Sequence, residues 1–269
     1  MAPLLANARM YSVTPQAKAA WRTLIEWVIA RARFPAQFVD HDPPKLLSEL
    51  WSRNDLGAVQ MCGLPASLRN PAPTILAAPV PSLPRYAGRA IYMSDLAVRA
   101  NSPFKTVEDT FGGIAGYSLK DSQSGYFAFR YYLQTHHAPA RGRYRRIVGN
   151  LLNPRGVIKA LAAGEIDIGP LDGYVFDLIR DGDPAYAAPV RVLASTDPTP
   201  MPPIVATAPL DASSVQRLRD GFMAAGSEPS LAPARATLLI ERFVVPELSE
   251  YGETRRRAER VEREGEDWP

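Results

Sequence analysis

The sequence predicts an α/β protein of two lobes, each a mostly parallel sheet flanked by helices. Its 269 residues correspond to about two domains at roughly 150 residues per domain. Strand-like and helix-like segments alternate along the first part of the chain, which is typical of parallel strands connected by helices. The same alternation restarts after Ser102 and continues to about Ser195, and this restart indicates a second lobe.

Helix starts are marked by a capping side chain followed by proline, at Thr14-Pro15, Asp42-Pro43 and Asn153-Pro154. Such a side chain accepts a hydrogen bond from the first helical turn, and proline fits there because it has no N–H to lose. The second of these helices is predicted to run through Trp51. The third is predicted to end at Gly164, because glycine suits the left-handed residue that closes a helix.

Short apolar or β-prone runs between turn residues are predicted strands. In the first part of the chain they are 4–10, 36–39, 56–61, 74–80 and 89–99. In the remainder they are 113–117, 144–148, 166–168, 190–194 and 204–206. Further helices are expected at 63–68, from Thr106, at 123–133, at 171–179 and at 211–223.

The segment after Pro198 is rich in proline, then becomes helical, and is too short for a third domain. We therefore expect it to pack back on the first lobe. This predicts a discontinuous lobe 1 of residues 1–97 plus 200–269 and an inserted lobe 2 of residues 98–199. The chain would cross between the lobes twice, with hinges near 94–100 and 194–203.

Composition excludes several classes of protein. The chain is 46% hydrophobic and 22% charged, which is typical of a soluble globular protein, and its longest apolar stretches fall far short of the ~18 residues of a membrane span. Cys62 is the one cysteine and there are three histidines, so neither a disulfide framework, nor a metal site, nor a cofactor is expected. A net charge of +3 gives no reason to expect nucleic acid as a partner.

The N-terminal residues have neither a basic segment nor an apolar run of about 7–15 residues, so no secretory signal peptide is predicted in them. This leaves two alternatives open: a cytoplasmic protein, or a sequence that starts at the mature form of an exported one.

Four segments follow one another in a recognisable order: Ser102–Asp109, Ala115–Tyr117, Asp121–Tyr126 and Leu161–Tyr174. In this order they resemble the substrate-binding proteins of phosphonate-type ABC transporters, and Pro200–Val205 is similar to the second crossover of that family. The resemblance runs from about Tyr11 to Thr207. One departure is Gly149–Leu152, which lacks the histidine that family members often carry there and so leaves the ligand class open.

The resemblance implies a type II periplasmic-binding-protein fold with a ligand cleft between the lobes. It implies a monomeric solute-binding protein that captures a small anionic or zwitterionic ligand, such as a phosphonate, phosphate-like or other oxyanion, and delivers it to an ABC permease and its ATPase. A periplasmic location and no catalytic step go with this function. The alternative is a cytoplasmic enzyme of the same fold, of the menaquinone-pathway or pyrimidine-synthase type, and a stand-alone ligand sensor also stays open.

The strongest candidate site is the start of the predicted helix at Ser122-Gln123-Ser124-Gly125-Tyr126. A helix N-terminus presents free N–H groups to an anion, the serines add hydroxyl donors, and glycine lets a ligand approach the backbone. A plain helix cap would favour serine equally. The same two alternatives apply to Asp172, which follows a predicted strand and precedes a helix, whereas Tyr174 also suits a core position.

The remaining candidates lie where predicted strands end. Tyr11 and Ser12 follow the first strand, Gln60 and Gly63 follow the third, and Tyr92 and Ser94 lead into the first crossing. Open α/β folds bind ligands at such ends of parallel strands. Cys62 is expected to be a buried small residue, and the basic run 141–146 a surface loop.

Overall fold

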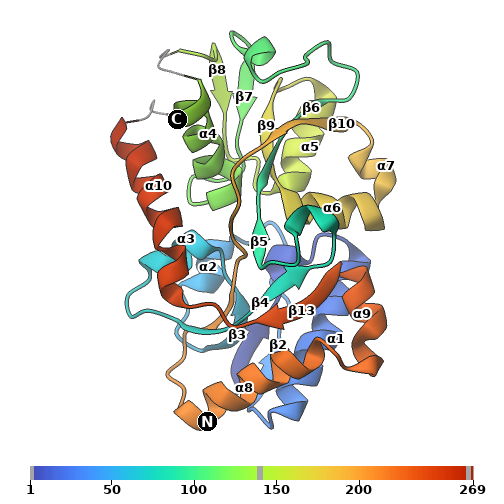
Figure 1. Cartoon of the computed structure of the whole chain (residues 1–269), viewed down its shortest axis with the longest axis vertical. Helices are drawn as coiled ribbons and strands as arrows, with labels where there is room; N and C mark the ends of the chain where they lie inside the picture. Colours follow the sequence, from blue (N-terminus) through green and yellow to red (C-terminus); the bar gives the residue numbers. More distant parts are fainter. Residues whose placement is uncertain (1–2, 138–141, 265–267, 269) are drawn as a thin grey trace. The chain divides into compact units, whose positions relative to one another are not determined.

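The computed structural model describes residues 3–137, 142–264 and 268 (Figure 1). The chain divides into two compact units: unit 1 is Met1–Ile91 with Pro200–Tyr251, and unit 2 is Tyr92–Thr199 with Gly252–Pro269. The chain therefore passes between the units three times. Arg141, the first residue of the basic run, and the first two residues of the N-terminal segment lie outside the described residues.

Unit 1 is built on a six-stranded sheet of order β13-β4-β12-β3-β1-β2. Its strands are β1 (Leu4–Asn7), β2 (Ala36–Phe38), β3 (Leu56–Gln60), β4 (Thr74–Pro81), β12 (Ile204–Ala206) and β13 (Ile240–Val244). β1 is parallel to both β2 and β3, whereas β12 and β13 pair antiparallel with their neighbours. The strands before the first crossing thus run in one direction, and the two contributed by the returning chain oppose them.

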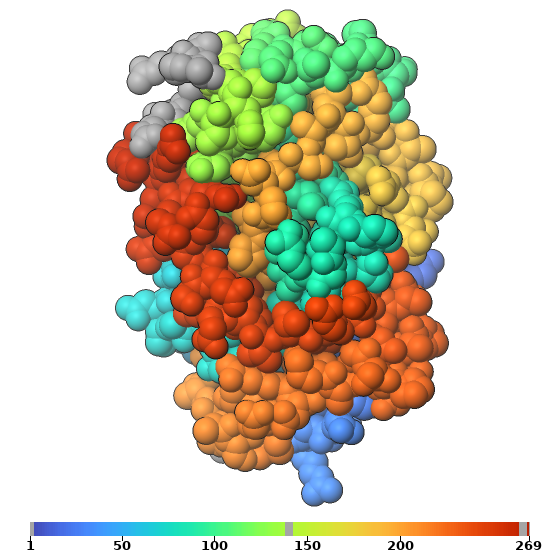
Figure 2. All heavy atoms as spheres, viewed as in Figure 1, coloured from blue at the N-terminus to red at the C-terminus, as the bar shows by residue number. Residues whose placement is uncertain are grey.

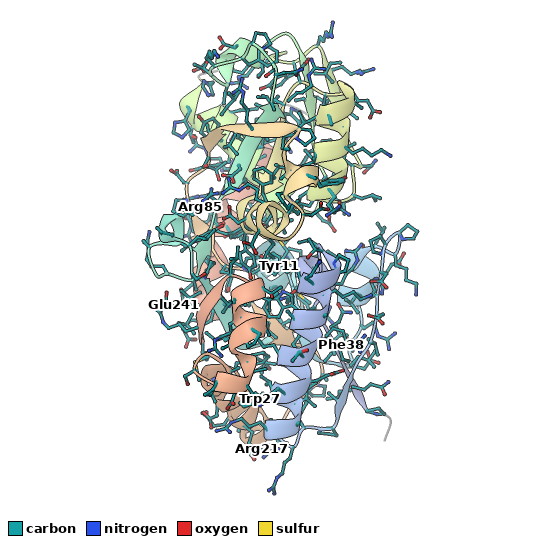
Figure 3. The ribbon with its side chains drawn as sticks, turned by 90° about the vertical axis from the view of Figure 1, so that its right-hand side faces the viewer. Tyr11, Trp27, Phe38, Arg85, Arg217 and Glu241 are labelled. Carbon is teal, nitrogen blue, oxygen red and sulfur yellow. The ribbon has the colours of Figure 1, made fainter. Side chains whose placement is uncertain are left out.

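The helices and turns of unit 1 are η1 (Arg9–Tyr11), α1 (Pro15–Arg31), α2 (Leu47–Trp51), α3 (Gly63–Leu68), η2 (Pro84–Tyr86), α8 (Ala212–Ala225), η5 (Pro229–Leu231), α9 (Ala232–Thr237) and η6 (Leu248–Tyr251). The Thr14 cap is confirmed, since its hydroxyl accepts the Ala17 N–H at 3.1 Å. At the other end of α1, Arg217 of α8 donates to Ala32 O at 3.0 Å (Figure 3). The returning chain is therefore tied to the first helix.

Unit 2 contains a three-stranded sheet of order β10-β6-β9 and a parallel pair, β7 with β8. Its strands are β6 (Ser94–Arg99), β7 (Ile114–Gly116), β8 (Arg146–Val148), β9 (Gly169–Asp172) and β10 (Val190–Ser195). β6 is antiparallel to both neighbours. A parallel bridge between Ala115 and Ile168 places the carboxyl end of β7 beside the start of β9. The α/β fold class is confirmed, but the mostly parallel sheet expected in lobe 2 is wrong, because β6 pairs antiparallel with both β9 and β10.

The remaining elements of unit 2 are η3 (Glu108–Thr110), η4 (Gln123–Phe127, a π-helical turn), α4 (Ala128–His136), α5 (Pro154–Ala163), α6 (Gly173–Gly182), α7 (Pro184–Ala187) and α10 (Gly252–Glu264). Both predicted ends of α5 are confirmed, because the Asn153 side chain accepts from Gly156 N and Gly164 is left-handed. β5 (Ile91–Tyr92) and β11 (Thr199–Pro200) pair with each other and contain two points at which the chain passes between units. The first of these points, between Ile91 and Tyr92, precedes the expected hinge at 94–100, where strand β6 lies.

Several predicted boundaries are wrong. The strand expected at 4–10 ends at Asn7, and the strand expected at 89–99 is divided into β5 and β6. The helix expected from Asp42 begins only at Leu47, because a residue that precedes proline is disfavoured in helical conformation and Pro43 precedes Pro44. The strand expected at 166–168 is β9 at 169–172, and the next helix begins after it because Asp172 caps that helix. The helix expected from Thr106 is only a 3₁₀ turn, η3.

The C-terminal segment was expected in lobe 1, but Gly252–Pro269 belongs to unit 2. Figure 2 shows the red atoms of α10 against the yellow-green atoms of α4, and Arg130 of α4 pairs with Glu262 of α10 at 2.9 Å. Trp268 is buried among Tyr117, Tyr126, Phe129 and Tyr144, with ring centroids 5.4–6.5 Å apart. The interior of unit 2 is thus completed by a residue at position 268.

We expect Trp268→Ala to lower the free energy of unfolding by about 3 kcal/mol or more, because it empties a large space inside an aromatic cluster. Trp27→Ala is the matched control, since Trp27 is only half-buried on α1 of unit 1 and its loss should cost less. Urea denaturation followed by circular dichroism measures both. An equal or smaller loss for Trp268→Ala would contradict the packing of this segment on unit 2.

Candidate site at the carboxyl ends of the strands

Within unit 2 the serine segment and Asp172 lie together. The Ser124 hydroxyl donates to Asp172 Oδ2 at 3.2 Å, and Asp172 Oδ1 accepts the Val175 N–H at 3.0 Å. Ser94 is the register partner of Asp172 between β6 and β9. Ser122 caps η4, its hydroxyl accepting the Gly125 N–H at 3.0 Å. Four of the residues that the sequence selected are therefore neighbours at the end of β9.

Gly125 has a packing role that the sequence did not reveal. A Cβ atom at this position would overlap Ser118 Oγ and lie 2.9 Å from Ser118 Cβ. The Ser118 N–H also donates to Gly125 O at 3.1 Å. Glycine is therefore required at this position because the Ser118 side chain approaches it so closely. The Gly125 N–H donates to the Ser122 hydroxyl, so this N–H is not available to a ligand, contrary to our expectation.

Asp172 is nearly enclosed, with 8% of its surface exposed. Burial is the largest influence and raises the pKa of Asp172 to about 7, because an apolar surrounding disfavours the charged carboxylate. The hydrogen bonds from Val175 and Ser124 oppose this rise, and the nearby carboxyl of Asp95 adds to it. Both protonation states of Asp172 are therefore accessible near neutral pH.

Three of the predicted tyrosine contacts are interior residues of unit 2. Tyr126 accepts a hydrogen bond from Arg130 at 2.7 Å and its ring packs against Tyr117 and Trp268. Tyr174 is fully buried, and this burial raises its pKa well above the usual value. Tyr92 is buried in β5. Of these residues, the sequence had named a core position as an alternative only for Tyr174.

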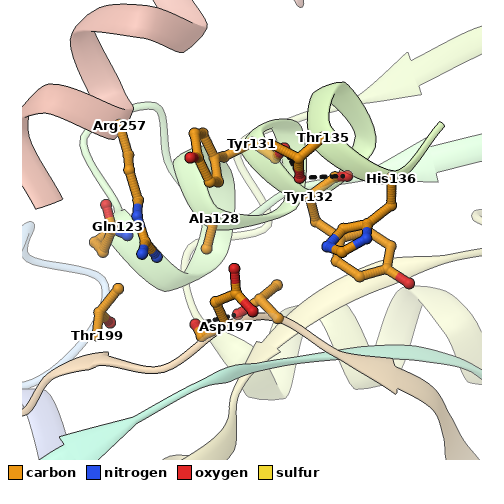
Figure 4. Close-up of a pocket in the computed structure, with 10 residues that line it drawn as sticks. Gln123, Ala128, Tyr131, Tyr132, Thr135, His136, Asp197, Thr199 and Arg257 are labelled. Atoms are coloured by element: carbon orange, nitrogen blue, oxygen red, sulfur yellow. Dashed lines mark hydrogen bonds between the residues drawn. The ribbon is translucent and has the colours of Figure 1, made fainter. Parts of the chain in front are cut away.

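Gln123 lines a small cavity of unit 2 together with residues of α4, α10 and the segment after β10 (Figure 4). The cavity measures about 10 Å³, which is the space for one water molecule. Gln123 Oε1 is buried and has no hydrogen-bond partner among the described residues. The Gln123 side chain is thus turned toward Arg257 and Thr199 in this cavity, and it forms no described bond to Asp172.

In unit 1 the ends of β1 and β3 bring two predicted residues together. The Tyr11 N–H donates to Gln60 Oε1 at 3.3 Å, and this bond fixes which end of the Gln60 amide is oxygen. Gln60 Nε2 then remains a buried donor without a hydrogen-bond partner among the described residues. Ser12 donates to Ala8 O at 2.7 Å and so holds the turn after β1.

Gly63, also a predicted contact, has a structural role in unit 1. A Cβ atom on it would lie 2.6 Å from Tyr251 Cδ1, and Tyr251 donates to Met201 O at 2.8 Å. Gly63 therefore makes room for a buried ring from the returning chain. Cys62 beside it is buried in an apolar cluster, as the sequence predicted.

The loop before α5 has a backbone conformation that the sequence did not predict. The Leu152 N–H donates to Ser118 O at 3.2 Å, and both Asn150 and Leu152 have left-handed backbone, with φ of 59° and 67°. Leu152 is 45% exposed, and left-handed backbone is uncommon for a leucine. Asparagine gave a sequence signal for such a turn and leucine gave none. This loop is the one in which the expected histidine is missing.

The part of the chain that the structure describes contains neither a metal-binding cluster nor a membrane-spanning helix. Among residues 3–137, 142–264 and 268, no group of three or more His, Cys, Asp or Glu side chains is arranged to hold a metal ion. Within the same part of the chain, none of the helices combines the length and the apolar character needed to cross a bilayer.

Comparison with known proteins gave a family match and several structural matches. The family model described as "ABC transporter, phosphonate, periplasmic substrate-binding protein" matches residues 57–251. No curated protein sequence matched. The similar solved structures have sequence identities below 25% with this chain, so their similarity shows the fold alone.

The first similar structure is a binding protein component of an ABC phosphonate transporter from Pseudomonas aeruginosa, with a TM-score of 0.80 and 16% identity over 97% of this chain and 88% of that one. A second is PhnD1 from Prochlorococcus marinus in complex with methylphosphonate, with a TM-score of 0.79 and 14% identity over 96% of this chain and 98% of that one. A third, a Xanthomonas citri protein bound to a chloride ion, has a TM-score of 0.73 and 19% identity over 98% of this chain and 99% of that one. The type II periplasmic-binding-protein fold is confirmed.

We expect Gly125→Ala to lower the free energy of unfolding by about 1–3 kcal/mol, because the new methyl group overlaps the Ser118 side chain. Adding Ser118→Ala should recover part of this loss by removing the nearest atom, and a double-mutant cycle in urea measures the coupling. Gly252→Ala is the control, since its Cβ would meet its nearest neighbour at an ordinary 3.5 Å. Additive effects of the two substitutions would contradict the proposed contact.

Proposed function

The chain belongs to the family of periplasmic substrate-binding proteins of phosphonate ABC transporters, and from this premise we propose that it captures a small oxyanion at Ser122, Ser124 and Asp172. The observation that carries the proposal is the hydrogen bond between Ser124 and Asp172 at the start of η4. It brings a hydroxyl donor, a helix N-terminus and a carboxyl group into one small region of unit 2. The family is one of solute-binding proteins, and nothing in the comparisons supports the enzyme alternative.

The chemistry of this region suits an oxyanion that also carries a hydrogen-bond donor. The first turn of η4, continued by α4, has N–H groups without a carbonyl partner in the helix, and these attract negative charge. Ser124 Oγ belongs to that turn, and Asp172 beside it is an acceptor of hydrogen bonds. A phosphonate with a hydroxyl or amino substituent provides both an acceptor end and a donor end.

Within unit 1 we propose a separate group of ligand contacts, Tyr11, Ser12 and Gln60. Their support is Gln60 Nε2, a buried amide donor without a partner among the described residues. Leaving such a donor unsatisfied costs about 1–3 kcal/mol, and a ligand oxygen would remove that cost. Tyr92, Gly63, Tyr126 and Tyr174 have packing roles, so we do not propose them as ligand contacts.

The finer features of the function remain proposals that follow from the family. We place the protein in the periplasm as a monomer that delivers its ligand to a permease and ATPase, without a catalytic step. A stand-alone sensor would bind the same ligand without such a complex. Binding of the loaded protein to the reconstituted transporter distinguishes these two roles.

We expect the two connecting strands β5 and β11 to act as hinges, because they contain points at which the chain passes between units. The closing motion of a binding protein makes the molecule more compact when the ligand is bound. Small-angle X-ray scattering with and without saturating methylphosphonate should therefore give a smaller radius of gyration for the bound form. An unchanged radius of gyration at proven saturation would contradict the hinge proposal.

We expect Ser124→Ala to weaken binding of methylphosphonate or inorganic phosphate about 10–150-fold, the equivalent of one hydrogen bond to a charged group. Ser124→Asp should weaken it further, since it places a carboxylate next to the oxyanion. Titration calorimetry measures the affinities, and circular dichroism shows that each variant is folded. Ser213→Asp, on the exposed first turn of α8 in unit 1, is the matched control and should bind like the parent.

The two binding outcomes that contradict the site are distinct. Parent-like affinity of folded Ser124→Asp would mean that the anion binds elsewhere on the protein. Failure of the parent to bind any of the phosphonates or phosphate would contradict the proposed ligand class.

A further inference from the structure

We propose that Asp172 takes up a proton when an oxyanion binds at Ser124, so that the protein captures the anion and a proton together. This inference rests on the proposed function and specifies it: the carboxyl group decides how much negative charge the site accepts. The inference follows from which of the two side chains, Ser124 or Asp172, donates the proton of their hydrogen bond and from the charged groups around them.

The direction of the hydrogen bond between Ser124 and Asp172 depends on whether Asp172 is ionised. Ser124 Oγ and Asp172 Oδ2 are 3.2 Å apart, and both residues are nearly enclosed, with 7% and 8% of their surfaces exposed. An ionised carboxylate can only accept hydrogen bonds, and a serine hydroxyl has one proton to give. When Asp172 is ionised, the Ser124 proton is therefore directed at Oδ2, and Ser124 presents only lone pairs to an anion.

Protonation of Asp172 reverses the direction of its hydrogen bond with Ser124. The other carboxyl oxygen, Oδ1, is held by the Val175 N–H at 3.0 Å as the cap of α6, so an added proton belongs on Oδ2. A protonated Oδ2 donates to Ser124 Oγ. The Ser124 hydroxyl proton is then released and can donate to the anion. One proton on Asp172 thus converts Ser124 from an acceptor into a donor and removes a negative charge beside the ligand.

Charged and titratable groups lie on several of the elements of unit 2 that pack around Asp172. From β6 comes the buried carboxyl of Asp95, which accepts from Ser195 at 2.6 Å, and from α6 come Tyr174 and Asp177, the latter paired with Arg180 at 3.1 Å. The side of η4 that faces β9 is uncharged. α5 packs on β9 through Val157, while its Arg155 pairs with Asp183 at 2.8 Å, and the residues of β7 are uncharged.

None of these described groups offers Asp172 a free positive charge that would keep it ionised. Burial and Asp95 raise the pKa of Asp172 to about 7, which agrees with the geometry. Above that pH the empty site holds an ionised Asp172, and anion binding there requires proton uptake. Below it the proton is already in place, so the affinity should no longer depend on this group.

Asp172→Asn tests the proposal directly, because asparagine copies the protonated carboxyl group. Its Oδ1 must face the Val175 N–H, which needs an acceptor, and its Nδ2 then donates permanently to Ser124 Oγ. The parent and this variant are titrated with methylphosphonate and with inorganic phosphate from pH 5.5 to 9, in two buffers of different ionisation enthalpy. The titration of the ligand itself is the same for both proteins, so the difference between them belongs to Asp172.

We expect the affinity of the parent to fall below that of Asp172→Asn by roughly tenfold per pH unit above about pH 7, and the two to converge below about pH 6. At pH 8.5 the parent should take up about one proton more per bound ligand than the variant. Asp211→Asn is the matched control: Asp211 caps α8 in unit 1 as Asp172 caps α6, and its replacement should leave the parent profile unchanged.

Equal pH profiles and equal proton uptake in the parent and in Asp172→Asn, with binding intact, would overturn the proton linkage and leave the proposed function standing. Absence of binding by the parent would overturn the proposed function itself. If Asp172→Asn fails to fold, Asp95→Asn gives the answer: Asp95 raises the pKa of Asp172, so removing that neighbouring charge should move the fall in affinity to lower pH. A profile that stays in place in folded Asp95→Asn would overturn the linkage equally.

Discussion

The arrangement of the candidate site depends on one close approach, that of the Ser118 side chain to the backbone of Gly125. Ser118 follows β7, Gly125 lies in η4, and the Ser118 carbonyl accepts the N–H of Leu152 in the loop before α5. Three connections of unit 2 therefore meet at one serine. Because these contacts fix η4, Ser124 arrives beside Asp172 at the end of β9. The hydroxyl that is proposed to bind the ligand is positioned by residues that need not touch it.

Asp172 shows that a helix cap and a ligand-binding group are not exclusive interpretations of an acidic residue after a strand. A carboxyl group has two oxygen atoms, and here each has a separate partner: Oδ1 holds the Val175 N–H and Oδ2 holds the Ser124 hydroxyl. The cap immobilises the carboxyl group, and burial makes its charge costly. Structural and chemical roles thus reside in the same side chain, and sequence reasoning that weighed them against each other posed the question too narrowly.

The sequence predicted features that depend on neighbouring residues and missed those that depend on distant ones. The caps at Thr14 and Asn153 follow from short-range hydrogen bonding, and the fold class follows from the alternation of elements and from the family resemblance. The role of Gly63 depends on Tyr251, nearly two hundred positions later, and no local pattern announces that contact. The interior placement of Tyr126 depends in the same way on Trp268, and the membership of α10 in unit 2 depends on its contacts with α4.

The discontinuity of both units has a consequence for how the chain becomes a folded protein during its synthesis. Unit 1 lacks two strands of its sheet until residues 204–206 and 240–244 have been made. Unit 2 lacks a helix and the buried ring of Trp268 until the ribosome has passed position 268. Neither interior can close while the chain is still growing toward these residues. Unit 1 can therefore acquire its final packing only after residues 240–244 have been made, and unit 2 only after position 268.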